Sequence, residues 1–131
     1  MTDAAPLTGV RVLDLSVMIS GPLAGMILAD QGADVIKVES PGLGDLMRLL
    51  GSSKGGVTGI YLNNNRGKRS LVLDLKQPAG ADVLKRLVAD ADVLIQNFRP
   101  GAMARLGLDY ETLSALNPDL IYVSISGYGP D

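Results

Sequence analysis

The residues best placed for chemistry are polar and basic groups that adjoin apolar segments. Ser20-Gly21-Pro22 follows one such segment and opens a predicted helix, whose N-terminal amides could receive an anion such as phosphate. A basic cluster lies further along a chain whose net charge is −2: Arg66, Lys68, Arg69 and Lys76. Phosphate or carboxylate would be the partner of such a cluster. Each motif also has a structural explanation, a tight turn for the first and a solvated turn for the second.

A third candidate is Asn97-Phe98-Arg99-Pro100-Gly101, which follows an apolar segment and precedes a predicted helix. It offers a side-chain amide, the only phenylalanine of the chain and an arginine. Arg99 and Arg105 could hold a phosphate together, or could be ordinary surface charges. Phe98 could equally fill the core.

Glu39 ends a predicted strand that follows a glycine turn. In a dinucleotide-binding fold, an acidic residue about 20 positions after that turn binds a ribose hydroxyl. The G-x-G-x-x-G fingerprint is missing, however, because the turn reads Ser20-Gly21-Pro22-Leu23-Ala24-Gly25. We therefore interpret Glu39 as a solvated strand end and disfavour an NAD site.

Composition excludes several other functions. The 131 residues contain no Cys and no His, which removes thiolate catalysis, disulfides and the commonest metal ligands, so no metal is expected. A net charge of −2 and an aromatic content of 4% argue against nucleic-acid binding. No apolar run is long enough to span a bilayer, and the first residues lack the pattern of a signal peptide, so we expect no membrane association and a cytoplasmic location. Neither G-x-S-x-G nor S-x-x-K occurs.

Apolar segments predict strands at 10–15, 34–39, 70–75, 93–95 and 120–125. Helices are predicted at 22–31, 78–89, 101–106 and 110–116, with a short helical piece near 46–50 inside an irregular stretch from 40 to 59. This alternation predicts an α/β fold, a Rossmann-like, open and mostly parallel sheet with helices on both faces. The first helix is apolar on nearly every side, so we expect it to be buried.

The chain stops in a turn directly after a strand that should be covered. We therefore expect residues 1–131 to be the N-terminal part of a larger domain. The motifs themselves resemble those of the family III CoA-transferases, which include formyl-CoA transferase, carnitine CoA-transferases and α-methylacyl-CoA racemase. The resemblance runs from about Leu7 to the end, in the segments Leu13-Asp14-Leu15-Ser16, Gly21–Gly25, Gly32–Glu39, Lys68-Arg69-Ser70, Leu73-Asp74-Leu75-Lys76, Asp92–Gly101, Asn117-Pro118 and Ser124–Gly129.

The resemblance implies a CoA-binding large domain, a small domain and two interlocked chains. It implies transfer of CoA between an acyl-CoA and a carboxylic acid through an aspartyl intermediate, whose Asp lies beyond this chain. Residues 1–131 would then lack the small domain and the catalytic segment, and would be inactive alone. The alternatives are a racemase-type enzyme, in which a His and an Asp exchange the α-proton, and a non-catalytic nucleotide-binding module.

The resemblance also assigns CoA contacts to matching positions. Ser40 stands where formyl-CoA transferase has an Arg near the nucleotide, and Arg105 matches a phosphate-binding Arg. The full set of assigned contacts is Ile19, Ser20, Ser40, Leu73, Asp74, Leu75, Lys76, Asn97, Phe98, Arg99 and Arg105.

Overall fold

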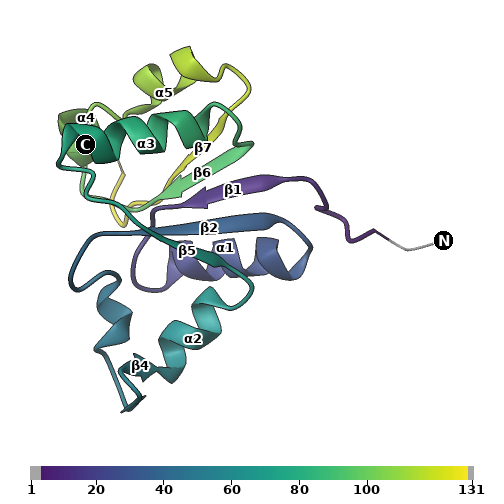
Figure 1. Cartoon of the computed structure of the whole chain (residues 1–131), viewed down its shortest axis with the longest axis vertical. Coiled ribbons are helices and arrows are strands. Elements are labelled where there is room, and N and C mark those ends of the chain that lie inside the picture. The colour runs from purple at the N-terminus through teal and green to yellow at the C-terminus, as the bar shows by residue number, and fades with distance from the viewer. Residues whose placement is uncertain (1–3, 130–131) are drawn as a thin grey trace.

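The computed structural model describes residues 4–129. Its main feature is a five-stranded sheet in the order β5-β2-β1-β6-β7, in which every neighbouring pair is parallel (Figure 1). The strands are β1 (Arg11–Asp14), β2 (Asp34–Glu39), β5 (Arg69–Val72), β6 (Val93–Gln96) and β7 (Ile121–Ser124). The predicted α/β class with a parallel sheet is confirmed.

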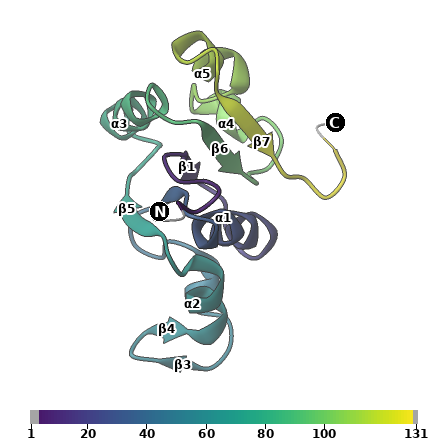
Figure 2. The ribbon, with the colours of Figure 1, turned by 90° about the vertical axis from the view of Figure 1, so that its right-hand side faces the viewer.

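Helices cover both faces of the sheet, as predicted. One face carries α1 (Ser20–Asp30), and the other carries α3 (Pro78–Val88), α4 (Ala102–Arg105) and α5 (Tyr110–Leu116) (Figure 2). Strand residues alternate between two cores because successive side chains point to opposite faces. Leu13 and Leu94 belong to the core under α3, whereas Val12 and Ile95 belong to the core under α1.

Two glycines let α1 approach the sheet closely. A Cβ on Gly21 would lie 2.3 Å from the Cβ of Ser16, and a Cβ on Gly25 would lie 3.0 Å from Asp14 Oδ2. The opposite side of the helix is open, and Ile27 is 46% exposed. The expectation that α1 is buried all round is therefore wrong within the described residues, since apolar character alone does not supply a covering element.

The stretch from 40 to 65 is more ordered than its sequence suggests. It contains a 3-10 helix, η1 (Leu46–Arg48), a hairpin of β3 (Ser53–Lys54) and β4 (Val57–Thr58), and helix α2 (Gly59–Asn65). The sequence analysis missed α2 because glycine and asparagine have low helix propensity. The helix is stabilised by the Thr58 side chain, which accepts a hydrogen bond from the Tyr61 N–H (3.2 Å), and by burial of Tyr61.

The third predicted strand is shorter than expected. β5 ends at Val72, and only the Leu73 N–H continues the ladder by donating to Glu39 O (2.9 Å). The chain then turns at Asp74, whose carboxylate accepts the Lys76 N–H (3.0 Å). Residues 73–76 thus form a crossing loop between the sheet and α3. Within residues 4–129, no helix is long and apolar enough to cross a bilayer.

Candidate functional site

The carboxyl ends of the parallel strands meet at one edge of the sheet, and the loops that follow them build the candidate site. The chain winds from β1 to β2 and β5 in one direction, and then returns to β6 and β7 on the other side of β1. Open α/β sheets bind ligands at such a switch point. Here the loops after β1 and β6 are joined, since the Val17 N–H donates to Asn97 Oδ1 (2.9 Å) and Asn97 Nδ2 donates to Val17 O (2.8 Å).

A cavity of about 370 Å³ opens at this edge. Its apolar wall comes from Leu15, Val17, Val38, Ala102 and Leu106. Eight of the eleven residues that the resemblance assigns to CoA also line it: Ser40, Leu73, Asp74, Leu75, Lys76, Phe98, Arg99 and Arg105. The arrangement offers apolar surface and several cations to one ligand.

The remaining three assigned residues lie around the start of α1. Ser20 and Asn97 line a neighbouring cavity of about 410 Å³, which shares Phe98 and Arg99 with the first. Ile19, directly before α1, is 48% exposed and lines neither cavity. The Asn97 side chain exchanges two hydrogen bonds with Val17, so it shapes the loop, and it keeps one amide N–H and one oxygen lone pair for another partner.

The basic cluster does not form the open anion site that its sequence suggests. Arg66 pairs with Asp30 (2.5 Å), and Arg69 pairs with Asp34 (2.6 Å). The third member, Lys68, is buried against a carboxylate described below. Of the four cluster members, only Lys76 lines the 370 Å³ cavity. Of the two explanations that the sequence leaves open, the exposed pairs of Arg66 and Arg69 favour the solvated turn, because charges that are close in sequence here meet acidic partners from distant segments.

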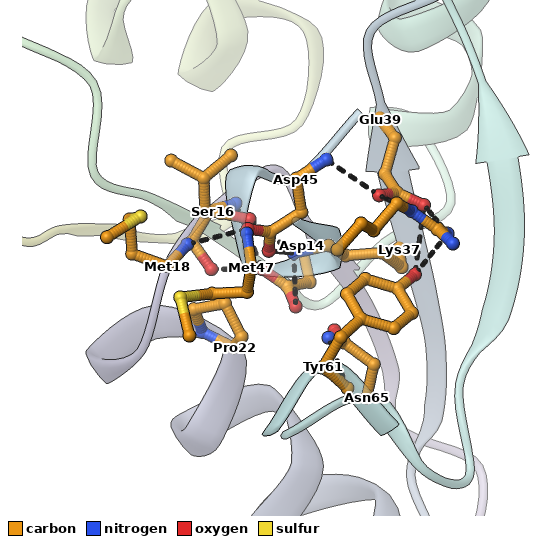
Figure 3. Close-up of polar contacts among 12 residues, drawn as sticks. Asp14, Ser16, Met18, Pro22, Lys37, Glu39, Asp45, Met47, Tyr61 and Asn65 are labelled. Carbon is orange, nitrogen blue, oxygen red and sulfur yellow. Dashed lines mark hydrogen bonds and ion pairs between the residues drawn. The ribbon is translucent and has the colours of Figure 1, made fainter. Parts of the chain in front are cut away.

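Beneath the loop after β1 lies a buried ionic cluster that the sequence analysis missed. Lys68 Nζ contacts Asp14 Oδ2 at 2.7 Å. Lys37 Nζ contacts Asp45 Oδ2 at 3.0 Å and Asp14 Oδ2 at 3.9 Å (Figure 3). Desolvation lowers the pKa of Lys68, and Asp14 acts in the opposite direction. The signal in the sequence was a charged residue, Asp14 or Lys37, within each of two apolar strands. In the structure these two residues are register partners on adjacent strands and face the same side.

Glu39 is also buried, so its interpretation as a solvated strand end is wrong. Its carboxylate accepts hydrogen bonds from Arg48 Nη2 (2.6 Å), the Tyr61 hydroxyl (3.0 Å) and the Asp45 N–H (2.9 Å). Desolvation raises the pKa of Glu39, but these hydrogen bonds outweigh it, led by that from Arg48, and the net pKa lies below its ordinary value. With its oxygens engaged, Glu39 is not free to bind a ribose.

The chain matches the model of CoA-transferase family III over residues 7–131. It is 51% identical over 131 residues to succinate–glutarate CoA-transferase of Agrobacterium fabrum, covering 95% of this chain and 33% of that protein. It is 46% identical to formyl-CoA:oxalate CoA-transferase of Bradyrhizobium diazoefficiens, covering 99% of this chain and 30% of that protein.

Solved structures agree with the family match. A CAIB/BAIF family protein from Brucella suis superposes with a TM-score of 0.91 at 45% identity, covering 98% of this chain and 35% of that chain. The chain therefore spans about a third of the length of the proteins it resembles. With the family model matched over nearly all of its residues, the chain belongs to CoA-transferase family III.

Proposed function

We propose that residues 1–131 form the nucleotide-binding part of a CoA site. The observation that carries this proposal is the convergence of three separate segments on one cavity: Ser40 after β2, the loop 73–76 after β5, and residues 98–106 after β6. These segments are the ones that the family resemblance assigns to CoA. Sequence and geometry therefore point to the same edge of the sheet.

The chemistry of the cavity fits a ligand with apolar and anionic parts. Lys76, Arg99 and Arg105 line it, and none of them forms an ion pair with another residue between positions 4 and 129. Unpaired cations of this kind suit phosphate groups. Lys76 and Arg105 also line an adjoining cavity of about 270 Å³ together with Lys85 and Asp82, so three cations and one carboxylate continue the surface toward α3.

For the whole protein, we propose CoA transfer between an acyl-CoA and a carboxylic acid. A carboxylate outside this chain would attack the thioester carbonyl, releasing CoA thiolate and leaving an acyl-aspartyl anhydride. The thiolate would then attack the aspartyl carbonyl, forming an aspartyl-CoA thioester and releasing the first acid. The relatives reported above are named CoA-transferases, which supports a transferase over a racemase.

In the same proposal, the longer protein has a small domain in addition to the large one and acts as an interlocked homodimer. No metal takes part in the reaction, and the enzyme works in the cytoplasm. The two substrates are an acyl-CoA and a free carboxylic acid. Residues 1–131 contribute CoA binding and leave bond making and breaking to the rest of the protein.

Calorimetric titration of CoA into the chain tests the site, with adenosine and NAD as comparison ligands. We expect CoA to bind best, and Arg105→Ala to weaken it by about 1–3 kcal/mol because a charged hydrogen bond is lost. Arg69→Ala is the matched control, since Arg69 pairs with Asp34 at the start of β5, away from the cavity. Equal affinity of the Arg105→Ala variant and the unaltered chain would remove Arg105 from the site. A folded chain that binds no CoA, or prefers NAD, would contradict the proposal.

A further inference from the structure

The loop between β1 and α1 is held by side chains from four places in the chain, three of them buried and that of Asn97 half-buried. The Ser16 N–H donates to Asp14 Oδ1 (3.0 Å), and the Ser16 carbonyl accepts Lys37 Nζ. Val17 exchanges two hydrogen bonds with Asn97. The Met18 N–H donates to Asp45 Oδ1 (3.0 Å; Figure 3). Nearly every backbone polar group of this short loop therefore has a fixed partner.

Met18 adopts a backbone conformation that most residues avoid. Its φ is 72°, and among residues 4–129 it is the only non-glycine residue with a positive φ. This left-handed region is disfavoured for residues with a Cβ unless surrounding contacts hold it. Met18 directly precedes Ile19 and Ser20, so its conformation decides where the chain enters α1.

Asp45 is the residue that bonds to Met18, and it is itself firmly placed. It is fully buried, and its Oδ1 also accepts the Met47 N–H (3.0 Å). Its Oδ2 accepts Lys37 Nζ (3.0 Å), and its own N–H donates to Glu39 Oε1 (2.9 Å). Asp45 lines neither cavity at the sheet edge. Asp45 can act on a ligand through the loop that it bonds to at Met18, and also through its neighbours Gly44 and Glu39, which line the 370 Å³ cavity.

We propose that Asp45 is a positioning residue that holds Met18 in the left-handed conformation and so sets the placement of Ile19 and Ser20 at the ligand-binding edge. The Lys37 ammonium orients the Asp45 carboxylate by binding Oδ2 while leaving Oδ1 to the loop. The part of this inference that concerns CoA rests on the proposed function. The part that concerns the loop conformation stands without it.

The test combines one variant of the buried acid with two variants of the loop. Asp45→Asn removes the charge that Lys37 needs, and the amide keeps one acceptor oxygen; when that oxygen accepts Lys37 Nζ, the amide nitrogen faces the Met18 N–H and cannot accept its hydrogen bond. Met18→Val leaves the ionic cluster untouched but places a β-branched residue at a positive φ, where such residues are rarely found. Met18→Asn favours the left-handed region, because asparagine tolerates it. Asp34→Asn, which alters an ion pair at the opposite edge of the sheet, is the control for general loss of stability.

Two measurements are made on each variant. The first is the intraresidue amide–Hα nuclear Overhauser effect at position 18, which is strong only at positive φ. The second is the affinity for CoA by calorimetry. If the loop keeps its conformation only about a tenth of the time, the affinity falls about tenfold, by ~1.4 kcal/mol.

We expect Asp45→Asn and Met18→Val to lose the strong Overhauser effect and to weaken CoA about tenfold. Adding Met18→Asn to Asp45→Asn should restore the strong Overhauser effect and the CoA affinity. Asp34→Asn should leave both quantities unchanged. If Asp45→Asn does not fold, the contrast between Met18→Val and Met18→Asn still decides the role of the loop conformation. The double variant Lys37→Met with Asp45→Asn then tests the role of Asp45, because it removes both buried charges together.

An unchanged Overhauser effect in Asp45→Asn would overturn the inference, as would an equal loss of affinity in Asp34→Asn. Loss of the strong Overhauser effect in Asp45→Asn or Met18→Val with unchanged CoA affinity would also overturn it, since the placement of Ile19 and Ser20 would then not matter for the ligand. If the unaltered chain binds no CoA, the proposed function fails separately, and the Overhauser measurement alone judges whether Asp45 holds the loop.

Discussion

Gly80, the third residue of α3, lies directly against the backbone of the loop that lines the 370 Å³ cavity. A Cβ at this position would lie 2.1 Å from Asp74 O and 2.8 Å from the Asp74 carbonyl carbon. Both atoms belong to the main chain, so they cannot turn aside as a flexible side chain could. Gly80→Ala must therefore move α3 or the 73–76 loop.

Two opposing effects determine the outcome. Alanine favours a helix interior over glycine by about 1 kcal/mol. Overpacking costs about 1–3 kcal/mol, and a backbone overlap at 2.1 Å belongs at the upper end of that range. We expect a net loss of about 1–2 kcal/mol in the free energy of unfolding. CoA affinity should fall as well, because Asp74 and Lys76 line the cavity.

Urea unfolding followed by circular dichroism measures the free energy of unfolding, and calorimetry measures the CoA affinity. Gly59→Ala is the matched control, since Gly59 begins α2 and a Cβ there would meet nothing within 4 Å. This control should be as stable as the unaltered chain or slightly more stable. If Gly80→Ala is as stable as Gly59→Ala, the close approach of α3 to Asp74 carries no energetic cost, contrary to this prediction.

Two further predictions concern the buried charges. Lys68→Met removes three hydrogen bonds and leaves the Asp14 carboxylate with Lys37 Nζ at 3.9 Å, so the free energy of unfolding should fall by about 3–5 kcal/mol. Arg66→Met breaks an exposed ion pair and should lower the free energy of unfolding by at most about 1 kcal/mol. Similar losses for the two variants in urea unfolding would show that burial does not strengthen the Lys68–Asp14 pair. For Glu39, whose net pKa is lowered from 4.5 on folding, the stabilisation is complete above that value and is lost as pH falls through the folded pKa. The stability difference between the unaltered chain and Glu39→Gln should therefore shrink on acidification, and a difference that is constant with pH would argue against an ionised Glu39.

Much of the fold could be predicted because its elements are local and strongly patterned. The strand predicted at 34–39 matches β2 at both ends, and the helix predicted at 78–89 differs from α3 by one residue. In both cases apolar periodicity and a nearby Pro or Gly mark the boundaries. By contrast, α2 depends on the Thr58 cap and on Tyr61 packing near Glu39, which no local pattern reveals.

Apolar periodicity and the order of the motifs are enough to predict the parallel α/β architecture, the family and the segments that carry the candidate site. Which charges remain unpaired, by contrast, depends on how distant segments pack together. Arg66, Lys68 and Arg69 look available in sequence but pair with carboxylates from distant elements, whereas Lys76 and Arg105 form no ion pair within residues 4–129. An ion pair depends on distance in space: the strand order β5-β2-β1 brings Arg69 to Asp34 and Lys68 to Asp14, and Arg66 meets Asp30 at the end of α1.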